Sequence, residues 1–400
     1  MDKKVKLGII GIGNMGSSHA KNMVNGNCPE FELVAVADTN PDRLQWTRDN
    51  VKADVACFDD AIAMLDSGLI EACVVAVPHY DHPKYAIACM QRGIHVMVEK
   101  PAGVYTLQVR EMMDEAAKHP EVVFGLMFNQ RTNALFKKLY ELVHSGKYGE
   151  IRRTNWLITN WYRSQGYYDS GAWRATWSGE GGGVLMNQCP HQLDLWQWIC
   201  GMPKTVHAHL HYGKWHDIEV EDDVTAYVEY PNGATGVFIT TTGDARGTNR
   251  FEIQMDKAKF VIEDNNKLTV TEYSMTEQEF SRSARDGFAT LEATTTEYKL
   301  DLSSGERYPA QNPQHVGVFN AWSAAILRGE PLVARGEEGI HGLTIANAMY
   351  LSDWLGKAVE LPFDEELYHA ELMKRVATSR RKVNVTAVFS DTSSSYGGTK

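Results

Sequence analysis

The first third of the chain alternates short apolar runs with longer stretches of helical length. Six runs have the length and apolar content of buried parallel strands: Val5–Ile10, Glu32–Ala37, Val55–Phe58, Glu71–Val77, His95–Val98 and Val122–Phe128. Parallel neighbours need a crossover connection, and the intervening stretches are long enough to supply one as a helix. The pattern therefore predicts an α/β fold that begins with a doubly wound parallel sheet over residues 1–127.

A different pattern follows. A helix is expected from about Thr132 to Ser145, then a strand at Ile151–Asn160, an aromatic loop and a helix that starts near Gly183. Beyond them, apolar and polar residues alternate as in strands with one buried face: Thr205–Tyr212, Val224–Tyr230, Ala234–Thr242, Arg250–Asp256, Lys259–Glu263 and Lys267–Tyr273. The Asn232-Gly233 pair between two of them is a hairpin-turn signal.

These runs predict a second α/β domain over residues 128–385, built on an open, largely antiparallel sheet with helices on one face. Because an open sheet with an apolar face needs cover, we expect a subunit contact on the other face. A helix around residues 335–357 is expected to pack back on the first domain. The stretch Ser390–Lys400 is rich in Ser, Gly and Thr, and residues 386–400 are expected to form a flexible or partner-contacting tail.

The turn after the first strand has the sequence Gly11-Ile12-Gly13-Asn14-Met15-Gly16. A chain that passes from a strand directly into a helix needs Gly11 for the tight turn, Gly13 for close approach of a pyrophosphate and Gly16 for helix-on-strand packing. The first helical amides, those of Asn14 and Met15 included, then face the phosphates. This order is typical of a Rossmann dinucleotide-binding domain.

The second strand is followed by Asp38, 22 residues after Gly16, where an acidic side chain would hold both ribose hydroxyls. A carboxylate there repels a 2′-phosphate, so the sequence favours NAD over NADP as the cofactor. Arg43, one helical turn further on, would soften that preference if it reached a phosphate. After the fourth strand, Pro78, His79 and His82 are expected to line the nicotinamide pocket.

A charged turn, Glu99-Lys100-Pro101, follows the fifth strand directly. Open α/β sheets bind ligands at the carboxyl ends of their strands, and the proline turn holds Lys100 at that crevice. A lysine so placed donates to a substrate hydroxyl, and Glu99 is expected beside the cofactor. The alternative is a surface lysine before a turn proline, which carries no chemistry.

A second cluster lies in the segment Gly181–Asp194. It opens with three glycines, which permit close approach of the backbone to a ligand, and sets Asn187, His191 and Asp194 at i, i+4 and i+7. On one helix these three side chains share a face, and such a helix directs a histidine at a reacting hydroxyl. A helical histidine is more often structural, but two polar neighbours on its stripe favour a site.

Substrate recognition is expected in the loop after the strand Ile151–Asn160. Aromatic and charged side chains gather there within about 14 residues: Trp161, Arg163, Tyr168, Trp173 and Arg174. Sugars combine apolar C–H faces with hydroxyl rims, so this mixture suits a carbohydrate; the alternative is that the aromatic residues form the domain core. Asn129 and Arg131, after the sixth strand, and His315 are further candidates near the crevice.

Composition narrows the classes of partner. The net charge of −11 and the lack of clustered Lys and Arg argue against nucleic acid. No apolar run approaches the roughly 18 residues of a membrane span and there is no room for a signal peptide, so a cytoplasmic protein is expected. The six cysteines lack Cys-x-x-Cys spacing, and His207, His209 and His211 spread along one strand. Neither a disulfide framework nor a metal site is expected.

In this order, the glycine loop, Asp38, the Glu99-Lys100-Pro101 turn and the Gly181–Asp194 segment resemble the Gfo/Idh/MocA family of oxidoreductases, over roughly residues 5–365. The resemblance implies a Rossmann domain and an open-sheet α/β domain that frequently forms dimers or tetramers, so a homodimer or homotetramer is expected. It also implies NAD(P)-linked redox chemistry on a sugar or cyclitol hydroxyl.

By the same resemblance, Lys100 matches the family's catalytic lysine and His191 matches the histidine that shuttles the hydroxyl proton. Many members carry an aspartate four residues before that histidine, whereas this chain has Asn187. Asparagine can orient a hydroxyl but cannot accept its proton, so the acid/base work is expected to fall on His191 and Lys100.

These features predict an NAD-dependent dehydrogenase of a sugar, sugar derivative or inositol-like cyclitol. One alternative is a glycoside-processing enzyme with tightly held NAD, which oxidises C3 transiently and then eliminates the glycosidic substituent. A second is an NAD-bound sensor without turnover, against which the presence of both Lys100 and His191 speaks.

Overall fold

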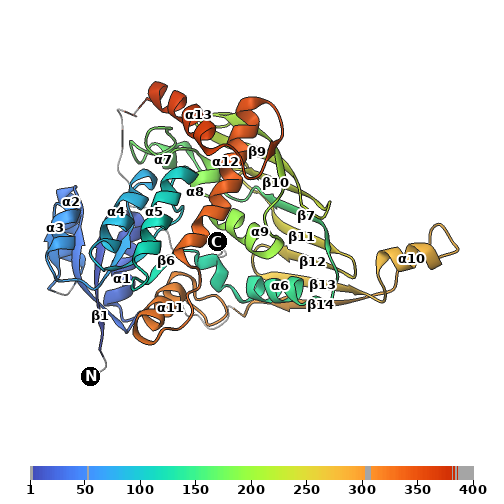
Figure 1. The fold of residues 1–400 in the computed structure, drawn as a ribbon, viewed down its shortest axis with the longest axis horizontal. Coiled ribbons are helices and arrows are strands. Elements are labelled where there is room, and N and C mark those ends of the chain that lie inside the picture. Colours follow the sequence, from blue (N-terminus) through green and yellow to red (C-terminus); the bar gives the residue numbers. More distant parts are fainter. Residues whose placement is uncertain (1–2, 52–53, 302–307, 381, 383–384, 386–400) are drawn as a thin grey trace.

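The structure is a computed structural model that describes residues 3–51, 54–301, 308–380, 382 and 385; the predicted tail, 386–400, lies outside them. Its strands form two sheets at opposite ends of the long axis of the molecule (Figure 1). This arrangement confirms the predicted fold class, a parallel Rossmann sheet followed by a mostly antiparallel one. The domain boundaries expected from sequence stay a prediction.

The first sheet contains six parallel strands in the order β3-β2-β1-β4-β5-β6. They are β1 (Val5–Ile10), β2 (Phe31–Ala37), β3 (Ala56–Phe58), β4 (Ala72–Val75), β5 (His95–Val98) and β6 (Phe124–Leu126). The connecting helices are α1 (Asn14–Val24), α2 (Pro41–Asn50), α3 (Ala61–Asp66), α4 (His82–Met90), preceded by the short helix η1 (His79–Asp81), and α5 (Thr106–Lys118). Strand order reverses between β1 and β4, and such a switch point opens a crevice at the carboxyl ends of the strands.

The second sheet has nine strands in the order β14-β13-β12-β11-β7-β10-β9-β8-β15. They are β7 (Ile151–Ile158), β8 (Thr205–Tyr212), β9 (Glu221–Glu229), β10 (Thr235–Thr241), β11 (Asn249–Met255), β12 (Ala258–Glu263), β13 (Lys267–Tyr273), β14 (Ala293–Lys299) and β15 (Val359–Glu360). Neighbouring strands are antiparallel except β7 and β10, which are parallel. The predicted hairpin is confirmed, since β9 and β10 pair across the turn that holds Asn232 and Gly233.

One face of this sheet is covered by helices, as Figure 1 shows for α6 (Ala134–His144), α9 (Pro190–Cys200) and α12 (Gly339–Leu355). The pleat of β8 illustrates the consequence, because Val206, Ala208 and Leu210 are buried while His207, His209 and His211 are exposed. Apart from α10 (Glu277–Ser283), the remaining helices of the described residues are η2 (Asn129–Thr132), α7 (Gln165–Tyr168), α8 (Val184–Asn187), α11 (Gln314–Arg328), η3 (Gly336–Glu338) and α13 (Glu365–Thr378). A subunit contact on the uncovered face stays a prediction.

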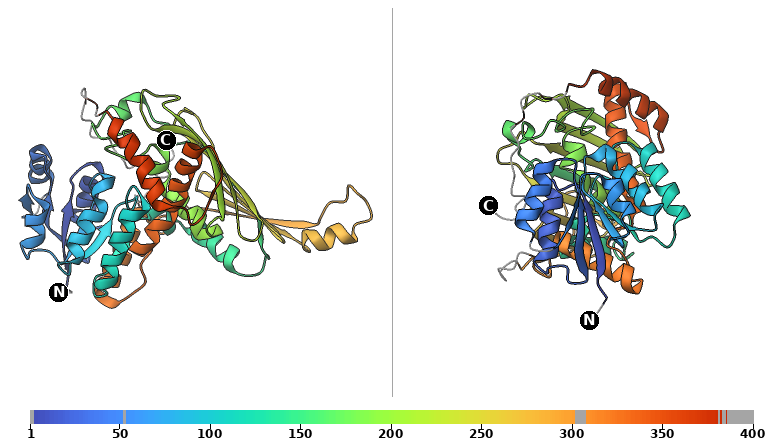
Figure 2. Two further views of the ribbon diagram at one scale, coloured as in Figure 1. Left: turned by 45° about the horizontal axis from the view of Figure 1, so that its top comes forward. Right: turned by 90° about the vertical axis from the view of Figure 1, so that its left-hand side faces the viewer.

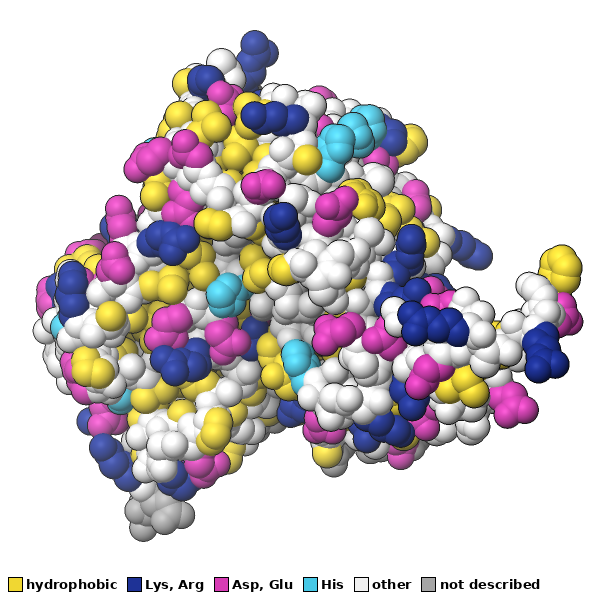
Figure 3. All heavy atoms as spheres, turned by 45° about the vertical axis from the view of Figure 1, so that its right-hand side comes forward, with side chains coloured by type: hydrophobic (Ala, Val, Ile, Leu, Met, Phe, Trp, Pro, Cys, Tyr) yellow, Lys and Arg dark blue, Asp and Glu magenta, His cyan; other side chains and the backbone are white. Residues whose placement is uncertain are grey.

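An arm not expected from sequence extends from the second sheet. The chain continues beyond the body of the domain between the strands β13 and β14, and this connection contains the short helix α10 (Glu277–Ser283), as Figures 1 and 2 show. Every residue of β14 is exposed, so its Ala-Thr-Thr-Thr-Glu-Tyr-Lys sequence lacks the alternation that marks a half-buried strand. Phe288, in the connection between α10 and β14, is 93% exposed, and Figure 3 shows a hydrophobic side chain at the outer end of the arm.

Two late helices join the sheets. In α11, Phe319 and Trp322 pack against Phe31 of β2 and so belong to the core of the first sheet. In α12, Asn347 accepts a hydrogen bond from the amide of Thr106 (3.2 Å) and donates one to the carbonyl of Val104 (3.1 Å). These bonds fix α12, which also lies against α9 and β8, to the start of α5.

A buried ion pair lies at the same junction. Arg131 of η2 donates to both carboxylate oxygens of Asp194 of α9, at 2.6 and 2.8 Å, and to Glu338 of η3 at 2.5 Å. Arg131 and Asp194 are 2% and 1% exposed. A two-pronged pair of this kind satisfies both charges, but removal of one partner leaves the other buried without a counter-ion.

Replacing Arg131 by Met should therefore lower the free energy of unfolding by about 3–5 kcal/mol, measured by urea denaturation followed by tryptophan fluorescence. As a control, Arg250→Met removes a half-exposed pair and should cost at most about 1 kcal/mol. Adding Asp194→Leu to Arg131→Met should recover part of the loss. An Arg131→Met variant no less stable than the control would contradict this account.

Candidate functional site

A cavity of about 940 Å³ lies at the carboxyl ends of the first sheet's strands, next to the loop that follows β7. The first sheet's side of its lining includes Gly11, Gly13, Asn14, Met15, Asp38, Pro78, His79, His82, Glu99 and Lys100. The second domain's side includes Asn160, Trp161, Arg163, Tyr167, Trp173, Arg174 and Asn187. The fold therefore brings most of the residues that we selected from sequence to one cavity.

The glycine loop is shaped for a close backbone approach. Gly11 has a φ of +90°, and a Cβ there would meet the carbonyl of Ala76 at 2.5 Å. A Cβ on Gly16 would overlap the carbonyl oxygen of Gly11, so α1 packs on β1 only with glycine at this position. Gly13 has no atom within 4 Å of an added Cβ and faces the cavity, which leaves room for a ligand against its backbone.

Asp38 closes this loop. Its carboxylate accepts hydrogen bonds from the amide of Ile12 (2.7 Å) and from that of Asn40 (2.8 Å). The end of β2 is thereby tied to the glycine turn, and the carboxylate still borders the cavity. Arg43, on α2, is not among the lining residues. The proposed softening of the NAD preference by Arg43 stays a prediction.

The turn after β5 is held by a buried acid. Glu99 accepts a hydrogen bond from His19 Nε2 (2.6 Å) and one from the amide of Lys100 (3.1 Å). Burial works against the charge, but the hydrogen bond and charge of His19 lower the pKa of Glu99 to about 2. From this fixed turn, Lys100 Nζ enters the cavity and donates to the carbonyl of Asn187 at 3.0 Å.

The Gly181–Asp194 segment is not one continuous helix, which corrects the prediction of a shared face. Helix α8 ends at Asn187, and α9 begins at Pro190 after a two-residue break. His191 therefore lies in the first turn of α9 and is 1% exposed, whereas Asn187 lines the cavity. Burial, and next the positive charge of Lys100, hold the pKa of His191 well below its usual range.

Asp194 and Arg131 also require a correction. Neither lines the cavity, because the two side chains form the buried ion pair at the junction. Asn129 is fully buried and donates to Gln314 (2.5 Å), and His315 packs 5.4 Å from the ring of His19. All four side chains are buried, and none of them is among the residues that line the cavity.

Sequence reasoning missed an acid behind the cavity. Glu180 is 2% exposed and accepts hydrogen bonds from the amide of Ala175 (2.6 Å) and from the side-chain amide of Asn187. Its carbonyl lies 3.3 Å from His79 Nδ1. Burial raises the pKa of Glu180, while Arg174 opposes the shift. A glutamate after Ser-Gly carries no sequence signal; only folding places it against Asn187.

In the substrate-side loop, Tyr168 is the residue expected to contact the substrate, but its neighbour Tyr167 faces the cavity instead. Tyr168 is buried and its hydroxyl lies 2.7 Å from Thr242 Oγ1, whereas Tyr167 lines the cavity. The guanidinium groups of Arg163 and Arg174 lie 5.1 and 4.6 Å from the ring centre of Tyr167. Trp161 and Trp173, which flank these arginines in sequence, line the same wall.

His82 has a supporting position. Its two ring nitrogens lie 2.7 and 2.8 Å from the carbonyl oxygens of Pro101 and Val77, and burial lowers its pKa. His79 is also buried, and its ring meets that of Trp173 at 5.8 Å. His82 thus links the segment after β4 to the turn that holds Lys100, and His79 links it to the wall of the second domain.

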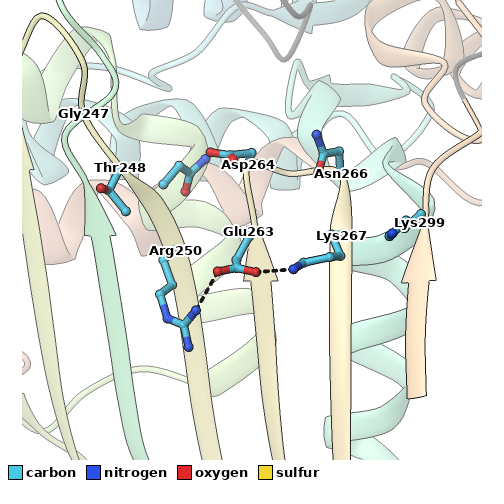
Figure 4. Close-up of a pocket in the computed structure, with 9 residues that line it drawn as sticks. Gly247, Thr248, Arg250, Glu263, Asp264, Asn266, Lys267 and Lys299 are labelled. Carbon is cyan, nitrogen blue, oxygen red and sulfur yellow. Dashed lines mark hydrogen bonds and ion pairs between the residues drawn. The ribbon is translucent and has the colours of Figure 1, made fainter. Parts of the chain in front are cut away.

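A second hollow, of about 460 Å³, lies where β11 to β14 meet their connecting turns (Figure 4). Glu263 pairs there with Arg250 at 2.7 Å and with Lys267 at 2.6 Å. It shares Asn249 and Asp264 with the large cavity but contains none of the residues selected from sequence. Because its central charges compensate one another, we place the chemistry in the large cavity.

Within the described ranges, no group of three His, Cys, Asp or Glu side chains is arranged to hold a metal ion. The helices of the same residues are too short or too polar to cross a bilayer.

Family models match both parts of the chain. Residues 5–126 match the oxidoreductase family with an NAD-binding Rossmann fold, and residues 136–261 match the GFO/IDH/MocA C-terminal domain. Among curated relatives, myo-inositol 2-dehydrogenase of Thermotoga maritima is 23% identical over 352 residues, which cover 86% of this chain and 95% of the relative. D-glucoside 3-dehydrogenase of Escherichia coli is 29% identical over 247 residues, 57% of this chain and 68% of the relative.

Solved structures agree. The WlbA dehydrogenase from Bordetella pertussis, in complex with NADH and UDP-GlcNAcA, has a TM-score of 0.73 and 25% identity, covering 90% of this chain and 100% of that one. A levoglucosan dehydrogenase in complex with NADH and L-sorbose shares the fold at 19% identity, with a TM-score of 0.73 and coverage of 90% and 100%. The resemblance drawn from the motifs is confirmed: the chain belongs to the Gfo/Idh/MocA family of oxidoreductases, and its Rossmann domain binds NAD(H).

Proposed function

We propose that this protein is an NAD-dependent dehydrogenase that oxidises a secondary hydroxyl of a sugar, sugar derivative or cyclitol. The observation that carries the proposal is the position of Lys100 in a cavity shared by the glycine loop and by an aromatic wall. Hydride transfer needs the cofactor and the hydroxyl side by side, and this cavity joins their two predicted sites. The inositol and D-glucoside dehydrogenases among the relatives support the substrate class.

The cofactor end fits a dinucleotide. Gly13 leaves its backbone open to the cavity beside the first amides of α1, where a pyrophosphate is favoured by the helix dipole. Asp38 borders the same space and is expected to accept from the ribose hydroxyls. When bound, the nicotinamide supplies the hydride acceptor; the following steps belong to the protein's own side chains.

Lys100 orients and polarises the reacting hydroxyl. Its ammonium is directed into the cavity by the Glu99 turn and steadied by the Asn187 carbonyl. We assign the proton to His191, whose ring is kept neutral by burial and by the charge of Lys100 and is therefore ready to accept it. Asn187 contributes an oriented side-chain amide. Its nitrogen donates to Glu180, and its oxygen is left on the cavity side, 3.4 Å from the Tyr167 hydroxyl.

A glycoside-processing reaction is the second candidate. The similarity to a D-glucoside 3-dehydrogenase favours oxidation at C3, which acidifies the neighbouring C–H and permits elimination of the glycosidic substituent. The two candidates differ in net NADH release. An assay of sugars, inositols and aryl glycosides that records both NADH absorbance and products separates them.

Replacing Lys100 by Ala should lower turnover by about a hundredfold or more and leave the NAD dissociation constant nearly unchanged, because the lysine contacts the hydroxyl rather than the pyrophosphate. Steady-state rates on the responsive substrate and calorimetric NAD titration measure the two effects. The exposed Lys137→Ala is the matched control. Near-normal turnover in Lys100→Ala would overturn the assignment.

The His191 ring should titrate below pH 6.5, its ordinary value. A lowered pKa means that the ring stays neutral as the pH falls, so oxidation should lose activity only on the acid side of that value. Lys100→Met removes a like charge and should raise the His191 pKa, whereas Lys137→Met should not. NMR titration of the ring, assigned by its loss in His191→Asn, tests this. An unshifted ring in Lys100→Met would exclude the coupling.

NAD(H) should bind at least about tenfold more tightly than NADP(H), because Asp38 repels a 2′-phosphate. Asp38→Asn should reduce this ratio, while the neighbouring exposed Asp42→Asn should preserve it. Calorimetric titrations with both cofactors give the ratios. Equal affinities in the unaltered protein would refute the role of Asp38.

A further inference from the structure

The substrate side of the cavity carries two arginines that have no carboxylate within ion-pair distance among the described residues. Arg163 and Arg174 both line it, and neither forms an ion pair with a carboxylate of any described residue. By contrast, Arg131, Arg250 and Arg328 each lie within 2.7 Å of a glutamate or aspartate oxygen. Because acidic residues outnumber basic ones in this chain, 51 to 40, two arginines without such a carboxylate in one cavity wall are informative.

Both guanidinium groups are held in place by neutral groups. Arg174 Nη1 donates to the hydroxyl of Tyr167 (2.8 Å), and its guanidinium carbon lies 4.7 Å from the ring centre of Trp173. Arg163 Nη1 donates to the carbonyl of Tyr162 (2.9 Å), and its guanidinium carbon lies 5.5 Å from the ring centre of Trp161. Each group has five N–H donors, so most of them are left for a ligand.

The charge of the cavity is divided between its ends. Lys100 adds a third cation beside the arginines, while Asp38, Asp59, Asp60 and Asp81 line the cofactor end. Glu180 behind the wall is buried, bonded to Asn187 and Ala175 and attracted by the charge of Arg174, so it offsets one of the three cations; Asp264 lines the far margin. The wall at Tyr167 therefore presents net positive charge to whatever binds against it.

We propose that the substrate carries an anionic group, a carboxylate or a phosphate, that binds between Arg163 and Arg174. Planar guanidinium groups match the geometry of both anions and bind them with charge-assisted hydrogen bonds. A neutral sugar would stack on Trp161 and Trp173 but leave two cations uncompensated in a partly enclosed space. This inference rests on the proposed dehydrogenase function and narrows its substrate to acidic or phosphorylated sugars and cyclitols.

The test compares matched substrates that differ in charge. D-glucose, D-glucuronate and D-glucose 6-phosphate form one set, D-galactose with D-galacturonate a second, and myo-inositol with its 1-phosphate a third. NADH formation gives kcat/KM for each. We expect the best anionic member of the responsive set to exceed its neutral counterpart by about tenfold or more, as charged hydrogen bonds do. Comparing the carboxylate members with the phosphate members shows which of the two anions the site prefers.

The variants are Arg163→Gln and Arg174→Gln, with Arg282→Gln on the distant helix α10 as the control that loses equal charge. Each cavity variant should reduce the ratio of anionic to neutral kcat/KM by about tenfold, and the control should retain it. The ratio is the readout because a general loss of folding or turnover lowers both of its terms.

Binding is measured separately by calorimetric titration of the same anions into the NADH-loaded protein. If an anion binds and both Arg163→Gln and Arg174→Gln abolish that binding, the anion subsite is supported, whether or not the compound is oxidised. If no compound of any set is oxidised, the proposed dehydrogenase function is refuted. Oxidation of neutral members at equal or higher kcat/KM would overturn the anion subsite and leave the dehydrogenase standing. A preference for anions that survives in both arginine variants would also overturn it.

Discussion

The site depends on one buried charge, the carboxylate of Glu99. Removing an ion from water is costly unless hydrogen bonds and an opposite charge compensate it, and here His19 and the amide of Lys100 do so. Because the acid has one satisfied arrangement, the turn after β5 has one as well. Lys100 leaves that turn and reaches the carbonyl of Asn187, so the same buried charge sets how the two sheets meet at the cavity.

The second constraint is the placement of acids around Asn187. A carboxylate at that position would lie on the cavity wall and would raise the pKa of the nearby histidine by its negative charge. Here the carboxylate belongs to Glu180, which is buried behind the wall and holds the Asn187 amide. After burial, the charge of Lys100 is the largest influence on the pKa of His191, and the charge of Glu99 opposes it.

Support for the cavity comes from residues that never reach it. Arg131 and Asp194 form a buried ion pair at the junction, and Asn347 ties α12 to the start of α5. These buried polar groups are satisfied only when η2, α5, α9 and α12 meet in one register. The position of the aromatic wall above the glycine loop follows from that register.

The sequence by itself determined the two sheets, the dinucleotide loop and the residues Lys100 and Asp38 at the strand ends. These features are local: strand and helix periods, glycines at turns, and polar residues directly after buried strands are written in neighbouring positions. The exposed arm was invisible because β14 buries no face and shows no alternation. Only the tertiary structure decided which polar side chains face the cavity. Packing between segments distant in sequence, which sequence spacing does not encode, decided three features. The helix breaks after Asn187, Tyr167 faces the cavity in place of Tyr168, and Glu180 is buried.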